Sequence, residues 1–141
     1  MNKQYNSVKK LKKISGISAK LLDAYVYWQG NTKHIPKMLR YSMGVRIDSL
    51  FAEIVELVYI SMFSPIDKKI LFLDKANIKN DLLKFMLNTL FELKGIKENV
   101  FIETSSKMEE IGRMFYGWKM RIEKENQIGR AKAEPIGKDK K

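Results

Sequence analysis

One repeat limits what this chain can fold into more than any other feature of its sequence. Seven residues are separated alternately by three and four positions: Phe101, Thr104, Met108, Ile111, Phe115, Trp118 and Ile122. This heptad spacing keeps one face of an α-helix against a partner helix. No stretch of the sequence shows the alternation of apolar and polar residues that is typical of strands. The sequence therefore predicts an all-α protein.

The first half of the chain contains the signals for two helices. Ser18 can cap a first helix, which is predicted to run to about Trp28 and to close at Gly30 and Asn31. Pro36 suits the first turn of a second helix, because the N–H group that proline lacks would have no partner there. That second helix is predicted to continue to about Phe63.

Two further helices follow. The clearest helix start in the sequence is at Ser64 and Pro65, where serine is expected at the N-cap and proline at the first helical position. This third helix should stop at Gly95. The fourth should begin near Glu98 and end about Asn126.

The second and third predicted helices also contain rows of apolar residues, similar to the heptad row of the fourth helix. The row of the second helix is Met43, Ile47, Leu50, Ile54 and Leu57. The third helix is less regular, with Ile78, Leu82, Phe85, Met86, Leu90 and Leu93. Short connections between long helices make neighbours run antiparallel. We therefore expect an up-and-down antiparallel four-helix bundle over residues 16–126, with residues 1–15 and 127–141 as basic, flexible ends.

The second helix has more apolar surface than one bundle core can bury. Off its inner row lie Val45, Phe51, Val55, Val58, Tyr59, Ile60 and Met62. A helix that is apolar on more than one face needs a second partner. We therefore expect the protein to self-associate.

Charge is distributed unevenly along the chain. Its 27 Lys and Arg residues against 16 Asp and Glu give a net charge of +11. Residues 1–15 contain five lysines and no acid, and residues 127–141 contain five basic residues against two acidic ones. The stretch between them is nearly balanced, with 17 basic and 14 acidic residues. A balanced folded unit with basic ends is typical of polyanion-binding proteins, although such ends can also serve only solubility. The predicted nucleic-acid contacts are Lys9, Lys10, Lys12, Lys13, Arg130 and Lys132.

The composition restricts the chemistry of the protein. The absence of cysteine excludes disulfides and thiolate zinc sites, and a single histidine excludes a His-pair metal site. That residue, His34, is expected to be an exposed loop residue. Asn77 and Asp81 lie four positions apart and suggest a polar network between helices, or else half of a metal site. We expect no cofactor, no metal and no catalytic residue.

A few residues of the helices are candidates for interfaces. Gly112 and Gly117 lie inside the heptad run, where each glycine costs about 1 kcal/mol relative to alanine, so a neighbouring helix is expected to approach closely there. Arg46 and Arg113 are flanked by apolar residues and, with Arg40, are predicted to contact a partner.

No segment has the length and apolar character of a membrane span, because Glu53 and Glu56 interrupt the most apolar stretch. The N-terminal residues also lack the pattern of a secretory signal. A cytoplasmic location and no membrane partner are therefore expected.

Three stretches of this sequence are similar to those of a known family. They are YSMGVRIDSL at residues 41–50, DKANI at 74–78 and SKMEEIGRMFYGW at 106–118. In this order they resemble the accessory variability determinant (Avd) proteins of diversity-generating retroelements. That group is related to the four-helix-bundle protein of 23S ribosomal intervening sequences. The resemblance spans about residues 20–122 and leaves out both basic ends.

The resemblance implies both an assembly and a function. It implies a homopentameric barrel of four-helix bundles that binds the reverse transcriptase of the element and its template RNA, and possibly cDNA. Such proteins support mutagenic retrohoming without known catalysis of their own. An intervening-sequence-type protein is the alternative, but the SIPSNIAEG-like stretch of that branch has no counterpart between Met43 and Ala52. A plain oligomeric scaffold would also fit the bundle, but it would leave the charge unexplained.

Overall fold

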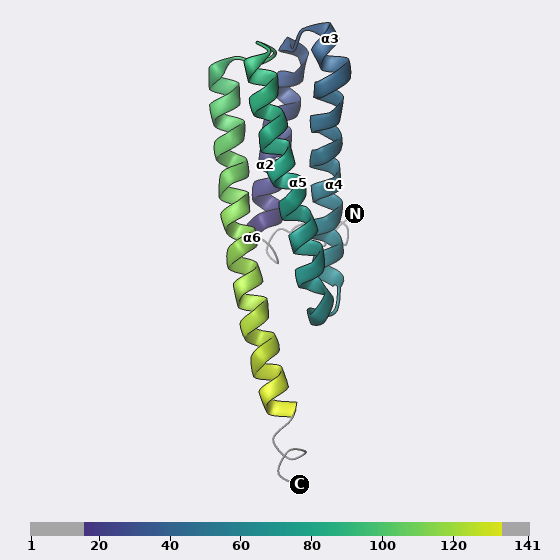
Figure 1. Cartoon of the computed structure of the whole chain (residues 1–141), viewed down its shortest axis with the longest axis vertical. Helices are drawn as coiled ribbons and strands as arrows, with labels where there is room; N and C mark the ends of the chain where they lie inside the picture. Colours follow the sequence, from purple (N-terminus) through teal and green to yellow (C-terminus); the bar gives the residue numbers. More distant parts are fainter. Residues whose placement is uncertain (1–15, 134–141) are drawn as a thin grey trace, which may run out of the picture.

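The computed structural model describes residues 16–133, and within them every regular element is a helix. Four long helices pack together: α2 (Gly16–Asn31), α4 (Val45–Phe63), α5 (Ile66–Glu92) and α6 (Glu98–Ala133). Figure 1 shows that they run alternately in opposite directions along one long axis. The predictions of an all-α protein and of four packed helices are confirmed.

The four helices do not contact one another equally. α4 packs along α5, α5 along α6, and α6 along α2, whereas α2 and α4 meet only sparsely. α6 is also much longer than α2, with 36 residues against 16. At a rise of about 1.5 Å per residue this corresponds to roughly 54 Å against 24 Å. The bundle therefore has four helices at the end where α5 joins α6, and α6 extends alone at the other end (Figure 1).

The boundaries of α2 differ from the sequence prediction. Ser18 lies inside the helix, so its predicted role as N-cap is wrong, and its hydroxyl instead donates to the Met62 sulfur of α4 at 3.4 Å. Gly30 is also helical, but α2 ends at Asn31, one of the two residues predicted to close it, and the Asn31 side-chain amide donates to the Tyr27 carbonyl at 2.8 Å. A single glycine costs too little to stop a helix whose preceding turn is anchored by the buried Trp28.

The predicted second helix is not one regular α-helix. After the short helix η1 (Thr32–His34), Pro36 precedes α3 (Lys37–Leu39), and a π-helical segment η2 (Arg40–Gly44) leads into α4. π-Segments are rare and leave no mark in the spacing of apolar residues, so the sequence did not predict this one.

The turn between α4 and α5 is fixed by side chains as well as by Pro65. The Lys69 ammonium donates to the carbonyls of Ser61 and Met62 at 2.9 and 2.7 Å, which satisfies the last carbonyls of α4. The buried Ser61 hydroxyl donates back to the Lys69 carbonyl at 3.1 Å. A helix starts here as predicted, but one residue later, because Pro65 is the N-cap and Ile66 the first helical residue. The Ser64 hydroxyl, however, donates to the Ile60 carbonyl at 2.6 Å and does not cap α5.

The end of α5 forms a Schellman motif. The Gly95 N–H donates to the Leu90 carbonyl at 2.8 Å and the Lys94 N–H to the Phe91 carbonyl at 2.9 Å. Lys94 has a φ of 61°, which makes it the one non-glycine residue with positive φ in the described chain. Gly95 is required for another reason, since a Cβ there would lie within 2.9 Å of Leu90 Cγ. The predicted stop at Gly95 is confirmed.

The core confirms two of the three predicted apolar rows. On α6, Thr104, Met108, Ile111, Phe115 and Ile122 are buried, and Phe101 and Trp118 pack against them. On α4, Ile47, Leu50 and Ile54 are buried, and Met43 and Leu57 pack against them. Phe51 and Val58 of α4 are also buried, so part of its surplus apolar surface is used within the bundle.

The predicted row of α5 is largely wrong. Ile78 and Phe85 are 67% and 66% exposed, and Leu82 and Leu93 are exposed as well. The residues that α5 buries also follow a spacing of three and four: Leu73, Ala76, Asn80, Leu83, Leu87 and Leu90.

The fourth helix is longer than predicted. α6 continues to Ala133, past both Asn126 and Gly129, so residues 127–133 are helical. The glycine costs about 1 kcal/mol in a helix, and the strong helix formers around it, such as Arg130 and Lys132, offset this cost. The domain prediction for residues 1–15 and 134–141 lies outside the described residues. None of the described helices has the length and apolar character needed to cross a membrane.

Candidate functional site

Six basic side chains on the described helices form ion pairs along the sides of the bundle. Their N···O distances run from 2.7 to 3.5 Å. Because the partners are partly exposed, each pair contributes only about 0–1 kcal/mol to stability. Their main effect is to neutralise the sides of the bundle. The pairs are Lys20 with Glu110, Arg46 and Lys79 with Glu53, Lys84 with Asp81 and Glu109, Lys107 with Asp23 and Glu103, and Lys119 with Asp74.

Two of these lysines have shifted pKa values. The hydrogen bond between Lys107 and Asp23 lowers the pKa of the Asp23 carboxyl and raises the pKa of the lysine. Burial alone would lower the pKa of Lys84, but its bonds to Glu109 and Asp81 outweigh this and raise it. Both lysines are therefore charged at neutral pH and already occupied by carboxylates.

The basic side chains without a carboxylate within 4 Å gather mainly at the two ends of the described bundle. One group, Lys33, Lys37, Lys94 and Lys97, lies where α2 leads into α3 and α5 joins α6. The other group lies on the last turns of α6, at the opposite end of Figure 1: Arg121, Lys124, Arg130 and Lys132. Outside these groups, Lys68, Lys75 and Arg113 also have no carboxylate partner among the described residues, and Arg40 and Lys69 bond to backbone carbonyls.

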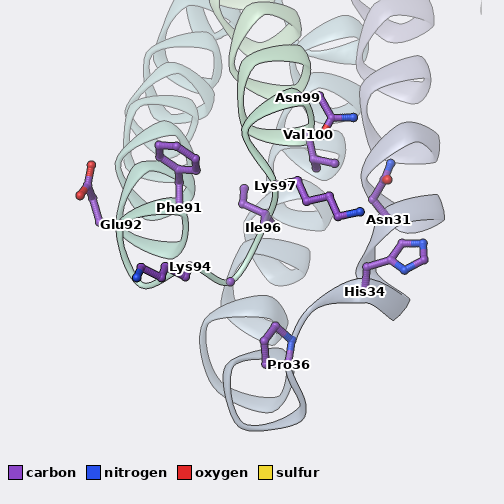
Figure 2. A pocket seen from close by; sticks show the side chains of 11 residues that line it. Asn31, His34, Pro36, Phe91, Glu92, Lys94, Ile96, Lys97, Asn99 and Val100 are labelled. Atoms are coloured by element: carbon purple, nitrogen blue, oxygen red, sulfur yellow. The ribbon is translucent and has the colours of Figure 1, made fainter.

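Two members of the first group, Lys94 and Lys97, line a pocket, which we call the loop-end pocket. It has a volume of about 610 Å³ and lies between residues 31–36 and residues 91–100. Figure 2 shows Lys97 extending from the start of α6 toward Asn31 and His34, while Lys94 lies on the other side of Ile96. Its lining residues are Asn31, His34, Pro36, Phe91, Glu92, Lys94, Gly95, Ile96, Lys97, Asn99 and Val100.

The predicted nucleic-acid contacts fall into two sets. Lys9, Lys10, Lys12 and Lys13 lie outside the described residues. Arg130 and Lys132 are exposed on the last turns of α6, so they project from a helix and not from a flexible tail. The loop-end group was not predicted, because its members come from two connections that only the fold brings together.

The three arginines predicted to contact a partner have different surroundings. The Arg40 guanidinium donates to the carbonyls of Lys33 and Ile35, at 2.9 Å from Nη2 to each, and so fixes the loop before α3. Arg46 is paired with Glu53 at 3.5 Å. Arg113 is exposed and borders a shallow groove. A contact between any of them and another molecule stays a prediction.

The two glycines of α6 also differ from each other. A Cβ on Gly112 would lie 3.3 Å from the Asn80 side-chain nitrogen, so α5 approaches α6 closely there, as predicted. A Cβ on Gly117 would have no neighbour within 4 Å, so no described helix approaches that position.

Polar contacts between α5 and α6 are made by the buried Asn80 and by a network that includes Asp81, which confirms the predicted polar network in part. Asn80 is fully buried and its amide donates to the Met108 carbonyl at 3.0 Å. Asp81 pairs with Lys84 at 3.3 Å, and the same lysine pairs with Glu109 of α6 at 2.9 Å. Asn77 lines the groove beside this network. Within residues 16–133 there is no cluster of three His, Asp or Glu side chains that could hold a metal.

A second hollow lies between α2 and α4, where the helices meet sparsely. It has a volume of about 520 Å³ and is lined almost entirely by apolar groups, among them Leu22, Tyr25, Val55 and Tyr59. Exposed apolar side chains therefore occur on α2 and α4 at this hollow, in addition to those on α5, and this is consistent with the expectation of self-association.

The described residues thus present neutral sides, basic ends, and a concave pocket at one basic end. Such an arrangement is suited to binding anions, because unpaired lysines attract phosphates and a pocket can enclose part of the ligand. No protein-family model matches this chain, and no curated protein is significantly similar to it. Inferences about its function therefore depend on its own residues.

Proposed function

We propose that this protein is a non-catalytic accessory protein of a diversity-generating retroelement. In this role it binds the reverse transcriptase and the template RNA in the cytoplasm, and it supports mutagenic cDNA synthesis. The observation that carries the nucleic-acid part is the separation of charge: carboxylates pair with six basic side chains on the sides, while most of the unpaired lysines and arginines lie at the ends. The reverse-transcriptase part is supported by the sequence resemblance to Avd proteins.

The unpaired cations can supply the binding energy for nucleic acid. Each lysine or arginine that contacts a phosphate releases condensed counterions, and a lysine that already has a carboxylate partner has less to gain. Lys33, Lys37, Lys94 and Lys97 at one end have no such partner among the described residues. The five lysines of residues 1–15 would add to this attraction.

Self-association would strengthen weak contacts of this kind. Exposed apolar residues on α4 and α5, such as Tyr59, Ile78 and Phe85, give each copy a surface to bury against another copy. The resemblance to Avd favours a ring of five. In such a ring the basic ends recur in every subunit, so weak phosphate contacts would add through high effective concentration.

The direct test is co-expression of the tagged protein with the reverse transcriptase and template RNA of the same retroelement. We expect the three to elute as one complex in size-exclusion chromatography. Failure to form a complex while the RNA is present would contradict the proposal.

A pair of charge reversals separates function from folding. Arg113→Glu should weaken the complex and leave the melting temperature unchanged, because Arg113 is exposed and has no carboxylate partner within residues 16–133. Lys68→Glu is the matched control, since Lys68 is also exposed and unpaired there but lies at the start of α5. Equal losses from both variants would indicate a general effect of charge.

A further inference from the structure

The loop-end pocket combines apolar surface with positive charge. Its apolar side is made by Pro36, Phe91, Ile96 and Val100. Phe91 is held in place by stacking on Phe101, with ring centroids 4.6 Å apart and planes 5° from parallel. This gives the pocket a preorganised surface against which a flat ring can pack.

Two lysines and one histidine lie at the rim of this apolar surface. Lys94 and Lys97 come from the α5–α6 connection and His34 from the α2–α3 connection, and none of them has a carboxylate within 4 Å among residues 16–133. Glu92 is the one acidic residue that lines the pocket, and Figure 2 shows it on the far side of Phe91 from Lys97 and His34. The side of the pocket between Ile96 and His34 is therefore the more positive one.

The backbone of Lys94 gives a separate indication that a lysine is useful here. Its φ of 61° lies in the left-handed region, where glycine or asparagine fits at lower cost. A lysine at this position keeps a positive charge beside the pocket at some cost to the fold, and such strain is commonly found at functional sites.

We propose that the loop-end pocket binds one unstacked nucleotide of a single-stranded RNA. This inference rests on the proposed function. It adds where the RNA binds and that the bound RNA is single-stranded. The phosphates on the two sides of the nucleotide lie against Lys94 on one side of Ile96 and Lys97 on the other. The base packs on Phe91 and Ile96, and the Asn99 amide at the rim offers hydrogen bonds to the base edge.

The shape of the pocket favours a single strand over a duplex. A volume of about 610 Å³ lies within the range of roughly 300–1,000 Å³ that is typical of small-molecule sites, so it can hold a nucleotide. Bases in a duplex are stacked and paired and cannot enter such a pocket, whereas bases of a single strand can be turned outward.

The test is a salt titration of the full-length protein on a short labelled oligouridylate. Lys94→Ala combined with Lys97→Ala should lower the log–log salt slope by about 1.4, since each phosphate contact of a single strand contributes roughly 0.7. Lys68→Ala combined with Lys75→Ala is the control, because it removes the same charge from two exposed lysines of α5 that have no carboxylate partner among the described residues. The control should change the slope little.

Two further measurements test whether weaker binding by the variant comes from a less stable fold or from contacts outside the loop-end pocket. Lys94→Gly should bind the oligouridylate more weakly without a lower melting temperature, because glycine suits the left-handed backbone better than lysine. His34 is the single histidine of the chain, so its imidazole signals in an NMR spectrum are unambiguous. These signals should shift on adding oligouridylate to the wild type and to the control, but much less in the Lys94→Ala, Lys97→Ala variant.

The outcomes separate this inference from the proposed function. If the wild type binds but both double variants have equal slopes, the loop-end pocket is not the site, while the proposed function stands. If the wild type binds no RNA even at low salt, both fail. Pairing the oligouridylate with oligoadenylate should remove the difference between the two variants, and an unchanged difference would refute the preference for single strands.

Discussion

At the scale of single residues, Gly112 and Gly117 show how two identical residues on one helix can serve different purposes. Gly112 lets α6 approach the buried Asn80 of α5, since a Cβ would lie 3.3 Å from the asparagine nitrogen. Gly117 meets nothing within 4 Å. The first glycine therefore belongs to the core of one chain, and the second remains available for a contact with another molecule.

This difference predicts opposite effects on stability. Gly112→Leu should lower the free energy of unfolding by about 1–3 kcal/mol, because the larger side chain overfills the contact with Asn80. Gly117→Ala should raise it by about 0.4–1 kcal/mol, because alanine restricts the unfolded chain and no neighbour is displaced. Urea denaturation of both variants at equal protein concentration measures the two effects. If both variants were destabilised alike, the close contact would not be specific to Gly112.

At the scale of elements, the helices differ in how well their sequences predicted their packing. The rows of α4 and α6 consist mostly of large apolar residues, such as Leu50 and Phe115, so spacing alone identified the buried face. The buried face of α5 includes Ala76 and Asn80, one small and one polar. Its outer face holds larger apolar residues such as Phe85, so a search for apolar spacing selected the wrong side.

The misassigned face of α5 leads to a prediction about assembly. Ile78, Leu82 and Phe85 lie on one face of the helix, because they are four and three positions apart, and all three are exposed. Phe85→Glu should therefore leave the helical content unchanged and reduce the mass of the oligomer in light scattering. Ser106→Glu, which adds the same charge at an exposed position of α6, is the control. A wild-type monomer at micromolar concentration would contradict self-association altogether.

At the scale of the whole molecule, the charge at the two chain ends was visible in the sequence, but the loop-end pocket was not. The lysines of residues 1–15 stand out because they are consecutive or nearly so. Lys33 and Lys97 lie far apart in the sequence and share one end of the bundle only because α2 and α6 pack together. Sequence patterns report neighbours along the chain, and a site assembled from two connections has no such pattern.

The contribution of the chain ends can be measured by removing residues 1–15 and 127–141. The last buried residue of α6 among those described is Ile122, and Arg130 and Lys132 are exposed, so the core should survive and the melting temperature should change little. Affinity for RNA and the salt slope should both fall, and the log–log slope should decrease by roughly 0.7–0.9 for each phosphate that the removed residues bind. Equal slopes for the full and the shortened protein would show that the ends serve only solubility.

The sparse contact between α2 and α4 also affects the order in which the protein can fold during synthesis. α2 leaves the ribosome first, but its ion pairs join it to α6, through Lys20 with Glu110 and Asp23 with Lys107. α4 and α5 are neighbours in sequence and can pair as soon as both have emerged. α4 can cover Tyr25 and Trp28 of α2, which stack on Phe51, but the side of α2 that faces α6 must wait until α6 is synthesised as far as about Met114, which lies beside Gly16. Translation of the last helix therefore sets the moment at which this side of the bundle closes.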